Sequence, residues 1–190
     1  MPVSLASTSG SSIKGAILPI GTYDIKVSNT YYYSFQNIPQ GYQDLMAVVS
    51  TRSTFSSGLI LNLGYSFNAG SATQSYLELR GDGSASSSNR VTSLPGYATA
   101  GFSPTINNAP NVFSSTIIHV LNYANTNTFK TILSRSACHL VGNGTTSLFT
   151  GLWQSTNAIN RFDIFDYGGG TNFLVEGSTI SLYAIRRIGQ

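Results

Sequence analysis

Few side chains in this chain are suited to acid–base chemistry. Its 190 residues include seven carboxylates, at Asp24, Asp44, Glu78, Asp82, Asp163, Asp166 and Glu176. A glycosidase needs two carboxylates flanking one bond, and Asp163 and Asp166 have an odd offset that places them on opposite faces of a strand. Glu78 and Asp82 could share a face, although Asp82 lies in a glycine-containing turn where Asp commonly bonds the backbone. We therefore expect no pair of catalytic carboxylates.

Histidine and cysteine do not have the spacing of a nucleophile or a metal site. His119 and His139 are not separated like zinc ligands, and Cys138 points away from His139 if both lie on one strand. Cys138 could instead pair with His119 on another strand, but only the positions of the two residues in the sequence support this. The favoured interpretation of Cys138 is a buried, unreactive thiol. The loop around Asp82 has one acid, whereas calcium takes about six to eight oxygen ligands. We expect a protein that is not an enzyme and has no metal or cofactor.

The composition of the chain excludes several classes of partner. Charged residues make up 9% of the chain, against roughly 25% in ordinary soluble proteins, and the net charge is +3. The basic residues are scattered, with Arg186 and Arg187 as the only adjacent pair, so we expect no nucleic-acid binding. No stretch approaches the roughly 20 apolar residues of a membrane helix, and the first residues do not resemble a secretory signal. These features predict synthesis in a cytoplasm and no membrane partner.

Short alternating runs rich in Tyr, Phe, Val and Ile recur along the chain and predict an all-β fold. About nine or ten strands are expected between turn signals, which is typical of an antiparallel β-sandwich, and the even number with long connections favours a jelly roll. A seven-stranded immunoglobulin-like sandwich is the alternative, but the paired cysteines are missing. The stretch 95–111, with its three prolines, is interpreted as irregular. We expect one domain over residues 22–190, preceded by an extended arm over residues 1–21.

The last forty or so residues contain two alternating runs around the glycine break at 168–170, which suggest a closing hairpin. The segment NYANT at 122–126, followed by KT at 130–131, GLW at 151–153 and SLY at 181–183, resembles a domain of structural proteins in the virions of tailed bacteriophages, cyanophages among them. The resemblance covers residues 112–187 well and 31–94 loosely, and Ala184 stands where that family usually has Gly. These motifs are turn and core residues, so they specify a fold more firmly than an activity.

The resemblance implies a virion structural protein assembled in a host cytoplasm. The first hypothesis is a capsid decoration protein that forms a homo-oligomer, with a trimer favoured, and stabilises the shell. Its arm would fill grooves of the major capsid protein or other virion proteins with four apolar residues, Leu5, Ile13, Ile17 and Leu18. Because bound copies sit on a repeating shell, each weak contact would add to a multivalent lattice.

The alternative is a tail-fibre or receptor-binding module that recognises host glycans. Its candidate contacts, for a glycan or a partner subunit, are Tyr31, Tyr32 and Tyr33, which alternate along a strand so that at least one ring faces each side. Trp153 could serve as an aromatic platform, but its neighbours Phe149 and Leu152 favour a place in the core. A secreted lectin-like domain is a third, weaker hypothesis, since the expected signal peptide is missing.

Overall fold

The structure is a computed structural model that describes residues 17–28, 31–140, 142–167 and 173–186. Leu5 and Ile13, two of the predicted arm contacts, lie outside the described residues. The described part is all-β and contains no helix, so none of it is a helix able to cross a membrane. Its strands are β1 (Ile17–Asp24), β2 (Tyr32–Gln36), β3 (Asp44–Ser50), β4 (Ile60–Phe67), β5 (Thr73–Gly81), β6 (Ser86–Pro95), β7 (Ala98–Pro104), β8 (Ser115–Val120), β9 (Lys130–Leu140), β10 (Asn143–Trp153), β11 (Arg161–Asp166) and β12 (Thr179–Ile185).

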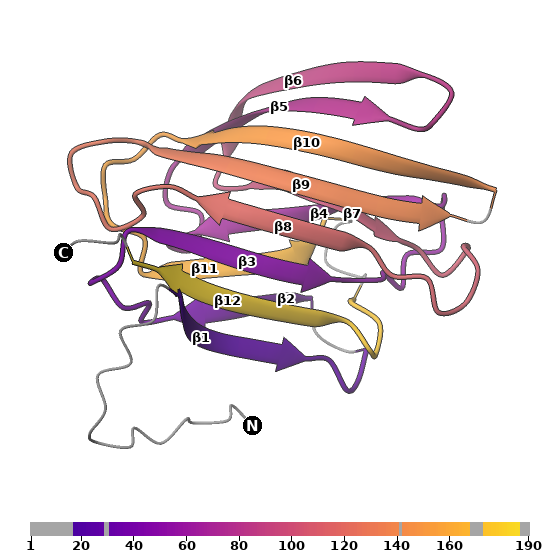
Figure 1. Cartoon of the computed structure of the whole chain (residues 1–190), viewed down its shortest axis with the longest axis horizontal. Helices are drawn as coiled ribbons and strands as arrows, with labels where there is room; N and C mark the ends of the chain where they lie inside the picture. Colours follow the sequence, from indigo (N-terminus) through magenta and orange to yellow (C-terminus); the bar gives the residue numbers. More distant parts are fainter. Residues whose placement is uncertain (1–16, 29–30, 141, 168–172, 187–190) are drawn as a thin grey trace.

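The strands form two antiparallel sheets of unequal width that pack face to face (Figure 1). The eight-stranded sheet has the order β1-β12-β3-β8-β9-β10-β5-β6, and the four-stranded sheet has the order β2-β11-β4-β7. In Figure 1 the larger sheet lies in front and the smaller one behind it. The predicted antiparallel β-sandwich is therefore confirmed.

The strand pairs are nested within one another along the chain. β1 pairs with β12, β2 with β11, β3 with β8 and β4 with β7, and every one of these pairs is antiparallel. Two hairpins, β5–β6 and β9–β10, are inserted into this scheme and widen only the larger sheet. Eight nested strands in two sheets are the pairing expected of a jelly roll. The jelly-roll assignment stays an interpretation, which this nested order supports.

The closing hairpin predicted from the sequence is wrong. β11 belongs to the four-stranded sheet, where it pairs with β2 and β4, whereas β12 belongs to the larger sheet, where it pairs with β1 and β3. The chain between them crosses from one sheet to the other. A glycine-rich segment can connect two strands of one sheet or two strands of different sheets. The local sequence pattern therefore could not distinguish a hairpin from a crossover.

Two strands lie where the sequence analysis expected none. β1 includes Ile17 and Leu18, so the end of the arm predicted over residues 1–21 is an edge strand of the sandwich. β7 lies inside the stretch 95–111, which was interpreted as irregular. All seven residues of β7 are buried, so the strand lacks the alternation of apolar and polar residues by which a strand is recognised in a sequence. Of the three prolines, Pro95 precedes the strand, Pro104 is its last residue and Pro110 follows it.

The core lies between the sheets and follows the two-residue period of the strands. On β9 every second residue is buried from Lys130 to Leu140, and on β10 the same alternation runs from Thr145 to Trp153. Trp153 is fully buried and its ring meets Phe67 edge to face at 5.7 Å, as expected of a core tryptophan. Cys138 is also buried, and burial raises the pKa of its thiol to about 11, so the thiol stays protonated and inert at neutral pH.

Hydroxyl groups join the sheets where β7 packs on β8 and β9. Ser136 Oγ accepts the Phe102 amide at 3.2 Å and shares a hydrogen bond of 2.9 Å with Thr116 Oγ1. Both side chains lie against Gly101, and a Cβ at that position would come within 2.8 Å of Thr116 Oγ1. The close contact therefore depends on glycine in β7 and on small polar residues in β8 and β9.

Lys130 is a buried cation that stabilises a loop rather than a site. It is the register partner of Trp153 and its Nζ lies 5.7 Å from the centre of the indole. The ammonium donates to the main-chain carbonyls of Thr128 at 2.8 Å, Thr156 at 3.2 Å and Ser155 at 3.4 Å. Burial lowers the pKa of this lysine, and the carbonyl oxygens supply the hydrogen bonds that its charge needs.

We expect the substitution Lys130→Met to lower the free energy of unfolding by about 2 kcal/mol, because it leaves three carbonyls without their charged donor. Chemical denaturation measures the effect. Lys26→Met is the matched control, since Lys26 is exposed and its ion pair with Asp24 lies at the surface. Equal losses in the two variants would show that Lys130 does not stabilise the loop.

Candidate functional site

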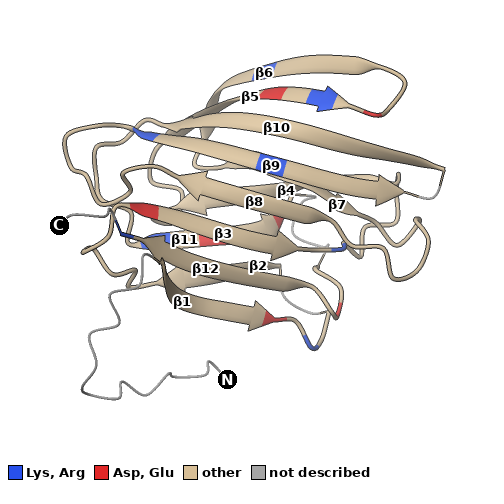
Figure 2. Ribbon diagram, viewed as in Figure 1, with Lys and Arg blue, Asp and Glu red and all other residues tan. Residues whose placement is uncertain are grey.

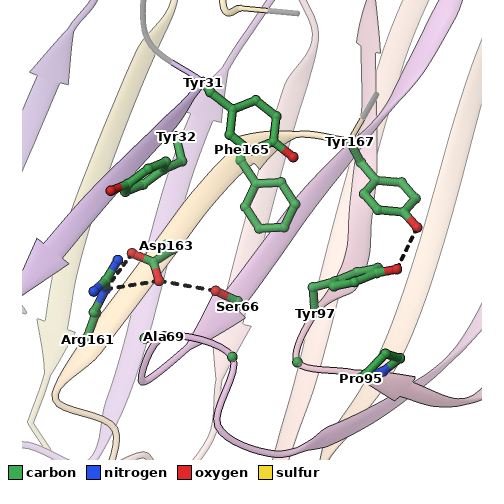
Figure 3. Close-up of a pocket in the computed structure, with 12 residues that line it drawn as sticks. Tyr31, Tyr32, Ser66, Ala69, Pro95, Tyr97, Arg161, Asp163, Phe165 and Tyr167 are labelled. Atoms are coloured by element: carbon green, nitrogen blue, oxygen red, sulfur yellow. Dashed lines mark hydrogen bonds and ion pairs between the residues drawn. The ribbon is translucent and has the colours of Figure 1, made fainter. Parts of the chain in front are cut away.

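A cavity of about 450 Å³ opens on the outer face of the four-stranded sheet (Figure 3). This volume is within the range of roughly 300–1,000 Å³ that is typical of small-molecule pockets. Aromatic rings make up much of its lining, together with one ion pair. The lining residues are Tyr31, Tyr32, Ser66, Ala69, Gly70, Pro95, Gly96, Tyr97, Arg161, Asp163, Phe165 and Tyr167.

Strand β11 supplies the centre of the pocket by its alternation. Phe162 and Ile164 point into the core and are fully buried. Arg161, Asp163 and Phe165 lie at the intervening positions and line the pocket. Because β11 is an inner strand between β2 and β4, the residues from its neighbours complete the site on both sides.

The ring of Phe165 lies flat across β4 because residue 64 is glycine. Gly64 is the register partner of Phe165, and a Cβ on Gly64 would come within 2.8 Å of the Cζ atom of that ring. Tyr31 lies against the same ring with a centroid distance of 5.9 Å, and Tyr97 approaches it edge-on at 6.4 Å. Glycine in β4 therefore allows three aromatic rings from distant parts of the chain to meet.

Tyr97 and Tyr167 form the other aromatic side of the pocket, away from the ion pair (Figure 3). Their rings are 4.9 Å apart and their hydroxyl groups share a hydrogen bond of 2.8 Å. This hydrogen bond raises the pKa of Tyr167 to about 12, so the Tyr167 hydroxyl stays protonated at neutral pH and remains able to donate or accept.

The polar side of the pocket is built around Asp163. Arg161 Nε donates to Asp163 Oδ1 at 2.9 Å and to Oδ2 at 3.1 Å, and Ser66 Oγ donates to Oδ2 at 3.1 Å. Asp163 is 4% exposed, so its charge lies in a poorly solvated place. The hydrogen bond to Asp163 raises the pKa of Arg161, so the guanidinium stays charged beside the carboxylate.

Two loops with left-handed backbone form the rim of the pocket. Asn68 and Ala69 have φ angles of 48° and 58° in the connection from β4 to β5, and Gly96 has a φ of 80° between β6 and β7. The loops meet where Gly96 faces Gly70, since a Cβ on Gly96 would come within 2.8 Å of the Gly70 carbonyl. Asn68 also accepts the Arg161 amide at 3.1 Å, which ties the rim to β11.

The structure places the sequence-predicted contacts in different surroundings. Tyr31 and Tyr32 line the pocket, as candidate glycan contacts should. The structure corrects the prediction that Tyr33 is a glycan or partner contact. Its ring packs in the core, 5.2 Å from the ring of Tyr23, so it is not a surface contact. Ile17 and Leu18 are exposed on β1, away from the residues that line the pocket.

Sequence reasoning missed most of the pocket. Arg161, Phe165 and Tyr167 were not considered, and Asp163 was set aside once its pairing with Asp166 failed. One signal was available, since the series from Arg161 to Tyr167 places four functional side chains at every second position. Ser66 and Tyr97 are far from β11 in sequence, and no local pattern connects them.

The remaining charged groups do not form a second site of this kind. Figure 2 shows the Lys and Arg positions scattered along the ribbon of the described residues. Within the described ranges, no group of three or more His, Cys, Asp or Glu residues could hold a metal ion. No family model, no curated protein and no solved structure matches this chain.

Asp166, at the end of β11, is fully buried beside the strand residues that line the pocket. Burial raises its pKa to about 7, and the hydroxyl of Ser53 only partly opposes this rise. The folded protein therefore holds a proton on this group that the unfolded chain loses near its ordinary value of 3.8. Asp166 favours the folded state fully below about pH 4, and this contribution is lost as the pH rises through 7.

We expect Asp166→Asn to abolish this pH dependence. A difference of about three between the two pKa values corresponds to about 4 kcal/mol, so the wild type loses up to that amount between pH 4 and pH 8 and the variant does not. Unfolding by urea at several pH values measures the slope. Asp82→Asn is the control, because Asp82 is exposed and backbone hydrogen bonds lower its pKa to about 2. An unchanged slope in Asp166→Asn contradicts the assignment.

Proposed function

We propose that this chain is a non-enzymatic saccharide-binding β-sandwich that acts as a receptor-binding or fibre module of a phage virion. The aromatic pocket on the four-stranded sheet carries the proposal. The face of an aromatic ring is electron-rich and attracts the weakly positive C–H groups of a sugar ring, while a carboxylate accepts hydrogen bonds from its hydroxyls. Phe165, Tyr31 and Tyr97 offer the first kind of contact and Asp163 offers the second.

The composition of the pocket supports binding rather than hydrolysis. Its lining contains one carboxylate, Asp163, and that group is held in an ion pair with Arg161. Hydrolysis of a glycoside needs a second carboxyl group on the other side of the scissile bond. Asp166 lies three positions along β11, but it is fully buried and does not line the cavity.

The virion setting is supported by the resemblance of residues 112–187 to phage structural domains, and by nothing in the pocket itself. The low share of charged residues fits a protein that works in contact with other subunits, because few charges need to be desolvated there. A glycan on a host surface is the partner that fits both the aromatic pocket and a place in a phage virion.

We expect Tyr97→Ala to weaken saccharide binding by about tenfold or more, since it removes one aromatic wall of the pocket. Glycan-array screening followed by calorimetric titration of the best ligand provides the measurement. Phe129→Ala is the matched control, because Phe129 is half-exposed and lies outside the pocket. Equal affinities in the two variants, or no saccharide bound by the wild type, would remove the proposed function.

A capsid decoration role is the second candidate, and the outer face of the larger sheet favours it. Five apolar side chains point outward there and are exposed at 38% or more: Val48, Leu77, Leu79, Leu133 and Leu148. Leu79 and Leu148 are register partners on neighbouring strands. Such a surface suits contact with a capsid subunit or with other copies in a homo-oligomer, as first expected.

If this face joins copies of the chain, the double substitution Leu79→Ser and Leu148→Ser should convert an oligomer into a monomer. Sedimentation velocity at micromolar concentration measures the change. Leu59→Ser serves as control, since Leu59 is equally exposed but precedes β4, outside the larger sheet. A wild type that sediments as a monomer would remove this support for a homo-oligomeric decoration protein.

A further inference from the structure

We propose that the pocket recognises an uncharged pyranose and rejects acidic sugars, with Asp163 as the acceptor of the sugar hydroxyls. This inference rests on the proposed saccharide-binding function and specifies its ligand. It follows from the charges of the lining, from the way in which Arg161 is held, and from the burial of Asp163.

The formal charges that line the pocket cancel. Arg161 contributes one positive charge and Asp163 one negative charge, and the other lining residues are neutral. An acidic sugar brings a carboxylate that needs a cation of its own. Arg161 is the one cation in the lining and its charge is already balanced by Asp163, so an acidic sugar would bring an unbalanced negative charge close to Asp163.

Arg161 is already committed to Asp163. Its Nε donates to both carboxylate oxygens, at 2.9 Å and 3.1 Å. Figure 3 shows the guanidinium turned toward Asp163 at one side of the pocket, near Tyr32, with Tyr97 and Tyr167 on the other side. Removing this guanidinium from a carboxylate that is 4% exposed would leave a buried charge unpaired, which is strongly unfavourable.

Asp163 itself is arranged as an acceptor for hydroxyl groups. An ionised carboxylate can accept about four hydrogen bonds. Among the described residues, Arg161 and Ser66 supply three, of which one goes to Oδ1 and two to Oδ2. Oδ1 therefore keeps capacity for a hydroxyl donor. A sugar carboxylate has no proton to donate at neutral pH and would be repelled by Asp163.

The aromatic side of the pocket agrees with a pyranose of either charge, so it does not decide the preference. Phe165, Tyr31 and Tyr97 offer apolar surface to the C–H groups of a sugar ring. The choice between neutral and acidic sugars depends on Asp163 and Arg161 alone. That separation lets an experiment test the preference apart from saccharide binding itself.

The test uses sugar pairs that differ only at C6, where the neutral sugar has a hydroxymethyl group and the acidic sugar a carboxylate, namely methyl glucoside against the methyl glycoside of glucuronic acid and methyl galactoside against that of galacturonic acid. Calorimetric or NMR titration of the full chain gives the affinity for each. For at least one pair we expect the neutral sugar to bind at least tenfold more tightly than its uronic acid. If sugars bind but neither pair shows this preference, the inference is overturned while saccharide binding stands.

Three variants assign the preference to Asp163. Asp163→Asn should weaken binding of the neutral sugar and strengthen binding of the uronic acid, because it removes the repelling charge and releases Arg161. Ser66→Ala keeps the charge of Asp163 and removes one hydrogen bond to Oδ2, so it should preserve the preference for the neutral sugar. Asp82→Asn makes the same change of net charge at an exposed hairpin and should alter neither affinity.

The outcomes separate the inference from the function on which it rests. If Asp163→Asn folds, as shown by its thermal unfolding, and keeps the wild-type preference, Asp163 is not the group that distinguishes neutral from acidic sugars. If it does not fold, the wild-type affinities for the sugar pairs decide, and the inference is overturned when neither neutral sugar is preferred. If no sugar of either kind binds, both the function and the inference fail.

Discussion

The site depends on the position of β11 as an inner strand of the smaller sheet. Its side chains alternate between the two faces, so Phe162 and Ile164 anchor the core while Asp163 and Phe165 build the pocket. A slip of one residue in its register would exchange these sets and would bury Arg161 in the core. Stability and the geometry of the pocket are therefore linked through the same strand, because the packing that holds β11 in register also positions Asp163 and Phe165.

The unequal width of the sheets explains which parts of the interior are polar. The hairpins β5–β6 and β9–β10 extend only the larger sheet, so β7 is an edge strand that lies beneath β8 and β9. At Gly101 the contact is made by the hydroxyls of Thr116 and Ser136, and beside it Phe102 packs in an apolar cluster with Cys138, Leu140 and Phe149. Each of these hydroxyls has a partner, which is the condition under which a buried polar contact stabilises.

The fold was largely predictable because most strands show the two-residue period. β9 is the clearest case, with strict alternation over its whole length. β7 was missed because it is buried on both faces, and the crossover after β11 was mistaken for a hairpin because turn residues do not specify which sheet receives the next strand. The pocket was less predictable for the same reason: nested pairing brings Ser66, Tyr97 and Asp163 together from separate strands and loops.

The two candidate functions use opposite surfaces of the sandwich and so are compatible in one molecule. The pocket lies on the outer face of the four-stranded sheet, whereas Leu79 and Leu148 lie on the outer face of the larger sheet. A copy attached to an assembly through the outer face of its larger sheet would present the pocket outward. Single sugar contacts are weak, but several copies fixed on one particle bind a glycan-covered surface with far greater avidity. In such an assembly the outer face of the larger sheet would set the number of sites, and the pocket would set their specificity.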